Sequence, residues 1–194
     1  MEADYLNSIR KQFNYYKQLG DKTFAQLNEE DFFWQFNAES NSIAVIVKHL
    51  WGNMLSRWTD IFTTDGEKEW RQRDTEFEND LRNREEVIVK WNEGWERFFE
   101  TLNGLKEDDL EKIIYIRNEG HTVLEALNRQ LAHYPYHVGQ IVFLGKMMRN
   151  ENWKSLSIPR NRSDEYNREK FSGERKRAHF TDELLDPDEN KGRN

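Results

Sequence analysis

The longest helix-like pattern in the sequence contains, near its middle, the stretch Gln130-Leu131-Ala132-His133-Tyr134-Pro135-Tyr136-His137-Val138-Gly139-Gln140. His133 and His137 are four residues apart, so on a helix they project from the same face, one turn above the other. Two imidazoles need this geometry to hold one metal ion. A third histidine, His49, lies in the middle of another strongly helical pattern. The sequence therefore predicts a helix bundle in which these three histidines meet and bind a divalent metal ion.

The composition favours one domain made of long helices. Of the 194 residues, 36% are hydrophobic and 34% are charged, and only three are proline and ten glycine. So few turn-forming residues suit long helices better than many short strands. The net charge of −7 disfavours binding along a phosphate backbone. A nucleic-acid partner is therefore not expected, although a local basic patch stays open.

The residue types present limit the chemistry. The chain contains no cysteine, so a metal must be held by His, Asp, Glu or main-chain oxygen, and no protein thiolate can act as a nucleophile. The acidic start, Met1-Glu2-Ala3-Asp4, lacks the basic and apolar regions of a signal peptide. No apolar run is long enough to cross a bilayer. We therefore expect a cytoplasmic protein without a membrane partner.

Four amphipathic patterns predict the main helices, at residues 5–27, from after Asn41 to residues 63–66, at 84–102 and at 122–149. Gly20 interrupts the first pattern. Cap signals support the other boundaries: Ser40 or Asn41 before the second helix, Gly66 at its end, and the pairs Asn83–Glu86 and Thr122–Glu125. The predicted class is all-α, a four-helix bundle with a long crossover.

Three segments lie outside these helices. Residues 67–79 form a long connection of mixed charge, which Trp70 and Phe77 are expected to attach to the helices. Residues 111–117 are short, partly β-branched and followed by Asn118-Glu119-Gly120, which predicts a small extended segment or hairpin before the last helix. Residues 172–194 are polar and charged, so we expect a mobile tail after a domain at residues 1–171.

Pro135 stands between the two histidines of the pair. A proline inside a helix removes one amide donor and clashes with the preceding turn, which costs roughly 3 kcal/mol. We therefore expect a kink or a loosened turn between His133 and His137.

The three histidines sit at the edges of apolar stripes, where a side chain can face a partly buried site. Asn53, Gln130 and Gln140 lie at helical spacing from them and can serve as hydrogen-bond partners of the imidazoles. Three neutral nitrogen ligands leave at least one open position, as in a catalytic metal site. Such a metal could activate a water molecule or a substrate thiol, and zinc or nickel fits imidazole ligands. The competing interpretation is a pair of surface histidines with no ligand.

Three further residues bear on the site. Arg57, two turns after His49, is expected to form an ion pair with another helix, or alternatively to hold an anionic group of a substrate. His121 precedes the Thr122 cap and is interpreted as a helix-start residue. His179 falls in the predicted tail and is not taken as a ligand.

With these motifs the chain resembles the DinB-like superfamily, also described as YfiT-like metal-dependent hydrolases. The resemblance covers about residues 5–160. Within the superfamily, the chain is similar to an uncharacterised bacterial branch. The matching stretches are Lys48-His49-Leu50, Asn53-Met54-Leu55-Ser56-Arg57-Trp58-Thr59-Asp60, the segment from Leu131 to Gln140, and Leu156-Ser157-Ile158-Pro159. The resemblance implies a four-helix bundle, a divalent metal on His49, His133 and His137, and a homodimer. Some related branches transfer bacillithiol, mycothiol or glutathione onto electrophiles.

The leading hypothesis is a metal-dependent enzyme that transfers a low-molecular-weight thiol to a small electrophilic substrate, with hydrolysis of a small substrate as its variant. Because the chain lacks cysteine, the thiol must come from outside. The alternative is a stress-associated binding or interaction protein whose metal is structural or vestigial. A third hypothesis is a helical oligomer without metal. No residue stands out as a general base.

Overall fold

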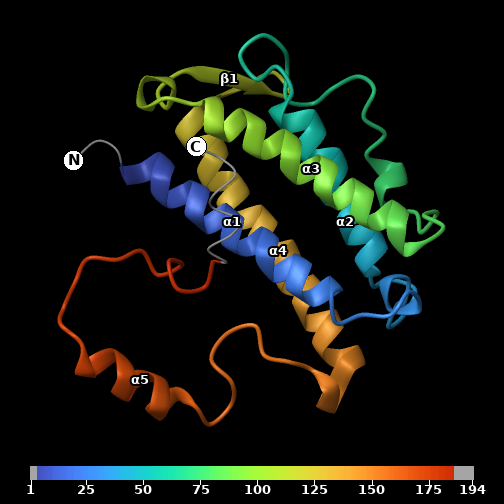
Figure 1. Cartoon of the computed structure of the whole chain (residues 1–194). Helices are drawn as coiled ribbons and strands as arrows, with labels where there is room; N and C mark the ends of the chain where they lie inside the picture. The colour runs from blue at the N-terminus through green and yellow to red at the C-terminus, as the bar shows by residue number, and fades with distance from the viewer. Residues whose placement is uncertain (1–3, 186–194) are drawn as a thin grey trace.

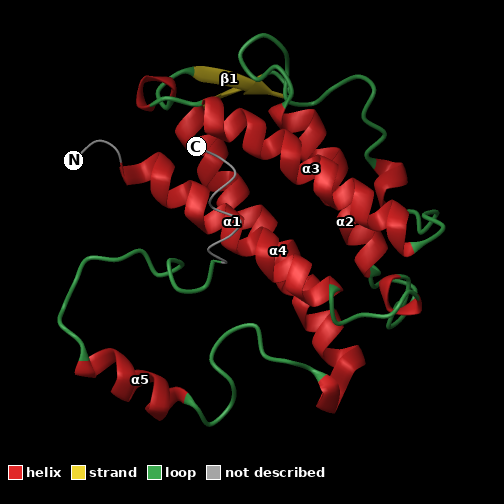
Figure 2. Ribbon diagram, in the orientation of Figure 1, coloured by secondary structure: helices red, strands yellow, loops and turns green. Residues whose placement is uncertain are grey.

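The computed structural model describes residues 4–185 and shows a mostly helical fold with one small two-stranded sheet (Figures 1 and 2). Its elements, in chain order, are α1 (Asp4–Phe24), α2 (Ile43–Trp58), α3 (Arg84–Gly104), β1 (Ile113–Ile116), β2 (Glu119–Thr122), α4 (Val123–Arg149) and α5 (Ser163–Ser172), with four short 3-10 helices between them. The helical class and the hairpin before α4 are confirmed, whereas the four-helix-bundle topology stays a prediction. In the part of the chain that the structure describes, no helix is both long enough and apolar enough to span a membrane.

The start of each long helix after α1 is set by a side chain that accepts a hydrogen bond from an otherwise unpaired backbone amide. Asn83 caps α3 through the amide of Glu86, and Thr122 and Glu125 form a reciprocal capping box at α4, as predicted. The cap of α2 is Ser42, whose hydroxyl accepts from the amide of Val45 at 3.2 Å. The expected Ser40 or Asn41 cap is wrong, because the helix begins only at Ile43.

The ends of α1 and α2 differ from the prediction. Gly20 does not interrupt α1; a Cβ there would lie 2.3 Å from the Trp91 ring, so glycine allows α1 and α3 to approach closely. α2 ends at Trp58, and Asp60 takes the left-handed conformation (φ 50°) that was expected of Gly66. The amide of Gly66 instead donates to the carbonyl of Tyr115 at 2.8 Å, which joins this connection to the hairpin.

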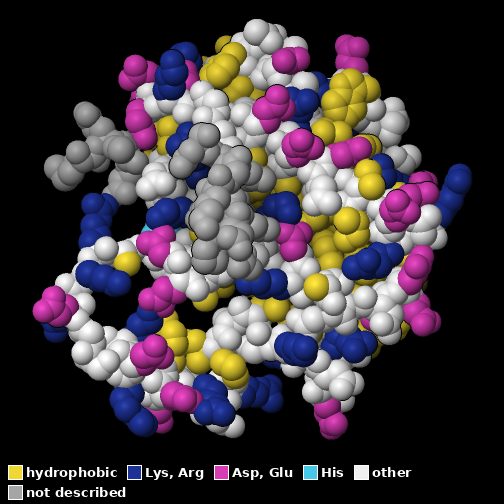
Figure 3. Space-filling model, in the orientation of Figure 1, with side chains coloured by type: hydrophobic (Ala, Val, Ile, Leu, Met, Phe, Trp, Pro, Cys, Tyr) yellow, Lys and Arg dark blue, Asp and Glu magenta, His cyan; other side chains and the backbone are white. Residues whose placement is uncertain are grey.

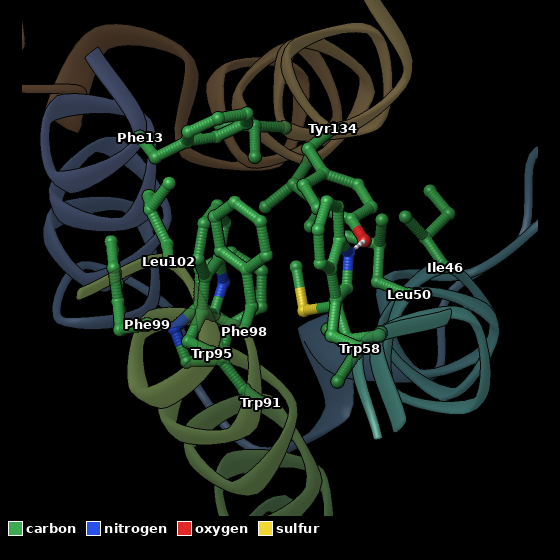
Figure 4. Packing of buried hydrophobic residues seen from close by; sticks show 14 of the residues in the cluster. Phe13, Ile46, Leu50, Trp58, Trp91, Trp95, Phe98, Phe99, Leu102 and Tyr134 are labelled. Carbon is green, nitrogen blue, oxygen red and sulfur yellow. Dashed lines mark hydrogen bonds between the residues drawn. The ribbon is translucent and has the colours of Figure 1, made fainter. Parts of the chain in front are cut away.

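One hydrophobic core joins the four long helices. α1 packs against α4 and α2 packs against α3 (Figure 1). Aromatic rings from α1, α3 and α4 meet at its centre, where the Phe13 ring lies 4.5 Å from Phe98 and 5.9 Å from Tyr134 (Figure 4). The indole of Trp58 donates to the hydroxyl of Tyr134 at 2.9 Å. Since Tyr134 lies between His133 and Pro135, this packing holds the histidine turn of α4 against the core.

The chain after α4 runs outside this core. α5 buries no residue and stands apart from the long helices (Figure 1). The chain then returns to α1, where His179 contacts the Ser8 hydroxyl at 3.0 Å and Lys11 pairs with Asp182 at 2.6 Å. The mobility expected for residues 172–194 and the domain boundary at 171 stay predictions, although residues 179–182 contact α1. The remainder of that tail, residues 186–194, lies outside the described residues.

Candidate metal centre

The three predicted histidines come together in the structure. The Nε2 atom of His133 lies 3.3 Å from that of His49 and 3.1 Å from that of His137. One ligand atom from each residue can be chosen so that all three lie within 4.8 Å of one another. His49 comes from α2 and the other two from α4, so the site joins two helices. This group could hold a metal ion.

Pro135 does not interrupt the helix that carries the pair. α4 continues from Val123 to Arg149, and both imidazoles still converge. Pro135 has no amide hydrogen to offer the carbonyl of Leu131, but the turn is held from its core side by buried Tyr134. The loosened turn that was expected therefore does not separate the two ligands.

Each imidazole is oriented by an oxygen acceptor at its Nδ1 atom. The acceptors are Glu76 Oε2 for His49 at 2.9 Å, Gln130 Oε1 for His133 at 3.2 Å and Gln140 Oε1 for His137 at 2.8 Å. An oxygen at Nδ1 requires the hydrogen to be on that nitrogen. In the neutral rings the three Nε2 atoms then carry the lone pairs, as metal-bound histidines do when a second group fixes their tautomer.

The electrostatics of His133 and His137 favour neutral ligands. Burial, with the neighbouring His137 and His49, lowers the pKa of His133 to about 3. Burial also lowers the pKa of His137 to about 4, against the opposing hydrogen bond with Gln140. Three converging lone pairs repel one another unless a cation lies between them. The donor set therefore fits a divalent metal, and near neutral pH these two rings need lose no proton to bind it.

Glu76 is the functional residue that sequence reasoning missed. It lies in the short 3-10 helix Asp74–Phe77, where its carboxylate accepts two hydrogen bonds from Arg71, at 2.7 and 3.0 Å, besides the one from His49. Burial raises the pKa of Glu76, but the bonds from His49 and Arg71 outweigh burial and hold that pKa below its usual range. In the sequence Glu76 is one charge in a mixed-charge connection, with no spacing that ties it to His49.

The connection between α2 and α3 lies directly on the site. Phe77 stacks on the His49 ring with 5.1 Å between centroids, while Trp70 is 55% exposed. The prediction that both aromatics attach this segment to the helices is therefore confirmed for Phe77, and for Trp70 it stays a prediction. Buried Arg71 and Glu76 also anchor the segment.

Two predicted partners act differently from expectation. The side chain of Asn53 accepts a hydrogen bond from the Tyr134 hydroxyl at 3.1 Å rather than from an imidazole. Arg57 donates to the carbonyl of Gly66 at 3.3 Å and lies 3.9 Å from Glu67. Its ionic partner is thus in the connection that follows α2 and not on another helix. Both residues line a cavity of about 400 Å³ onto which the three histidines open.

The remaining histidines lie elsewhere. His121 is in β2, opposite Ile114, directly before the Thr122 cap. His179 is bonded to Ser8 and Thr181 on the far segment of the chain. Neither belongs to the three-histidine group, as predicted.

Fold and site together define a mostly helical protein with a three-histidine group suited to a divalent metal. The chain belongs to a family described as a protein of unknown function, DUF1572, whose sequence model matches residues 1–162. The match includes both helices of the site and ends just before α5. No curated protein and no solved structure matches the chain.

Proposed function

We propose that this protein is a divalent-metal-dependent enzyme that transfers an external low-molecular-weight thiol to a small electrophilic substrate. The observation that carries this proposal is the convergence of three Nε2 lone pairs, each oriented by an oxygen acceptor at Nδ1. Three neutral ligands leave room for a substrate atom at the ion. When bound, the metal would lower the pKa of a thiol or water molecule at that position. Zinc or nickel fits the imidazole ligands.

The lining of the cavity favours thiol transfer over hydrolysis. None of the described residues that line it is a carboxylate, and Glu76 is already bonded to His49 and Arg71. Water activation would therefore lack a protein base. A free thiol has a pKa of about 8.5 even without a nearby cation, so it can lose its proton to solvent without the help of a protein base. Its sulfur then bonds to the electrophilic carbon, and the leaving group departs with the bonding electron pair.

The chain's own residues would position the reactants. Glu76, Gln130 and Gln140 fix the three rings, so that the open position faces the cavity. Phe77 covers one face of His49 and limits the access of water. The buried guanidinium of Arg57 would favour the thiolate over the thiol by its charge.

The resemblance to the DinB-like superfamily supports three finer proposals. These are a four-helix-bundle architecture, a homodimer and a cytoplasmic location. The packing of α1 on α4 and of α2 on α3 is compatible with the first.

The alternative is a stress-associated binding protein in which the metal is structural or vestigial. The lack of a carboxylate among the described residues that line the cavity is also what such a protein would show. In that case His137→Ala would lower the melting temperature and the metal content, while no substrate would turn over.

The transfer proposal is tested with metal-loaded protein, bacillithiol and a chlorinated aromatic electrophile. We expect an adduct above the uncatalysed rate, and none above it with His137→Ala. Failure with bacillithiol, mycothiol and glutathione alike would overturn the transfer. Elemental analysis of protein purified without an affinity tag tests the metal itself, since less than about a tenth of an equivalent would contradict every metal-dependent version.

A further inference from the structure

The cavity at the three histidines is strongly basic, although the chain as a whole carries a net charge of −7. Five arginines line it: Arg57, Arg71, Arg73, Arg117 and Arg129. They come from α2, from the connection after it, from the β1–β2 turn and from α4. On the face of the molecule in Figure 3, by contrast, Lys and Arg are interspersed with Asp and Glu. The cavity thus carries a local concentration of positive charge.

Too few carboxylates reach these arginines to balance them. Of the five arginines, Glu76 pairs only with Arg71, and it also bonds to His49. Glu67 is shared, since its Oε2 atom lies 3.3 Å from both Arg71 and Arg117 and 3.9 Å from Arg57. Among the described residues, no other carboxylate lies within ion-pair distance of the five. Five guanidinium groups therefore face two carboxylates, which leaves an excess of three positive charges before any metal binds.

Two of the arginines have no described acidic partner. Arg73 lies over the ring of Phe77, 5.4 Å from its centroid, and Arg129 forms no ion pair with a described residue. The nearby Asp65 carboxylate accepts hydrogen bonds from backbone amides, including those of Arg117 and Glu67. The oxygens of Asp65 therefore bond to the backbone and not to an arginine of the cavity.

Arg57 and Arg71 are the two buried members of the group, and Arg57 is the one that has an unused donor. Its side chain is 6% exposed, and its Nε atom has no hydrogen-bond partner among the described residues. Burial, together with the charge of Arg71, lowers the pKa of Arg57 to about 10, against the opposing charge of Glu67. A buried cation with an unused donor is costly unless another group supplies the acceptor.

We propose that the cavity binds a small molecule through an anionic group, a carboxylate or a phosphate, held by Arg57 and Arg129 beside the three histidines. This inference deepens the proposed function, because it assigns an anionic substrate or thiol to the same site. The volume of about 400 Å³ suits a small ligand. The acidic chain and its mixed surface charge disfavour a polyanionic macromolecule.

Calorimetric titration of metal-free protein with malate and with inorganic phosphate tests this inference, because neither probe can then bind through a metal. We expect one anion per chain at about 0.15 M salt, and weakening of roughly ten-fold in Arg129→Gln, the loss of one charged hydrogen bond. Arg129 is exposed, so this variant should fold normally. If malate binds more tightly than phosphate, the substrate carries a carboxylate. If phosphate binds more tightly, the substrate is phosphorylated.

Arg97→Gln is the matched control, since Arg97 is a partly exposed arginine of α3 that pairs with Glu100 away from the cavity. It should leave anion binding unchanged. Absence of binding for both probes at millimolar concentration would overturn the inference, and so would equal weakening by Arg97→Gln and Arg129→Gln. Because the titration uses neither metal nor turnover, its failure is distinguishable from failure of the transfer assay. His137→Ala should lose the metal and keep the anion.

Discussion

The carboxylate of Glu76 accepts a hydrogen bond from Nδ1 of His49 across 2.9 Å, although the two residues are 27 positions apart in the chain. Arg71 holds the same carboxylate from the other side. This arrangement fixes the tautomer and the direction of the one histidine that α2 contributes to the site. It makes Glu76 a positioning residue rather than a ligand.

Glu76→Gln should weaken metal binding while the fold is kept. The glutamine amide oxygen can still accept a hydrogen bond from His49. The substitution removes the negative charge that pairs with Arg71 and that makes the imidazole of His49 a better ligand. We expect a loss of roughly 10- to 100-fold in metal affinity, measured by competition with a chelator. Glu78→Gln, an exposed change in the same connection, is the control. Equal affinities in the two variants would contradict this role.

Gly52→Ala should displace Glu76. A Cβ at Gly52 would lie 2.2 Å from Oε1 and 2.8 Å from the carboxyl carbon of Glu76, so the carboxylate must move. We expect a loss of about 1–3 kcal/mol in the free energy of unfolding, as in other overpacked sites, together with weaker metal binding. Denaturant unfolding and a metal titration measure both.

Gly139→Ala is the matched control for that variant. A Cβ there would meet nothing within 4 Å, and Gly139 lies in the interior of α4. Alanine is the better helix former, so we expect a gain of up to about 1 kcal/mol in the free energy of unfolding. Destabilisation by Gly139→Ala equal to that of Gly52→Ala would show that contact with Glu76 is not the cause.

Tyr134→Phe should destabilise the junction between core and site. The Tyr134 hydroxyl accepts from the Trp58 indole at 2.9 Å and donates to Asn53 at 3.1 Å, and its ring is fully buried. Removing it leaves a buried donor and a buried acceptor unpaired, which costs roughly 1–3 kcal/mol each when no water replaces it. Urea unfolding measures this loss. Tyr136→Phe, at a position that is 62% exposed on the same helix, should change little.

The stability of the metal-free protein should fall in mild acid. The pKa values of His133 and His137 are lowered to about 3 and about 4, from 6.5 in the unfolded chain, chiefly by burial. Between the lowered pKa values of the folded chain and 6.5, the unfolded chain binds more protons than the folded chain. The free energy of unfolding therefore decreases as the pH falls below about 6.5. Thermal melts across this range measure the slope. The double variant His133→Gln, His137→Gln should show a shallower slope, and an unchanged slope would refute the assignment.

Local pattern was enough to predict most of the helices and part of the site. A helix repeats every 3.6 residues, so His133, His137, Gln130 and Gln140 share one face wherever the helix packs. The caps at Asn83 and Thr122 depend on side chains within three residues of the amides they accept. The end of α2 at Trp58 was not predicted, because Gly66 carries a stronger local signal for a left-handed residue than Asp60, which takes that conformation.

The sequence by itself thus determined the helical class, the histidine pair and its glutamine partners, since these follow from contacts along one helix. Only the tertiary structure decided that Glu76 orients His49, that Asn53 bonds to Tyr134, and that arginines from separate segments surround one cavity. Those relationships join residues far apart in the chain, through a connection whose course has no periodicity. They depend on which buried polar and charged groups pair when the chain folds, and local spacing in the sequence does not predict that pairing.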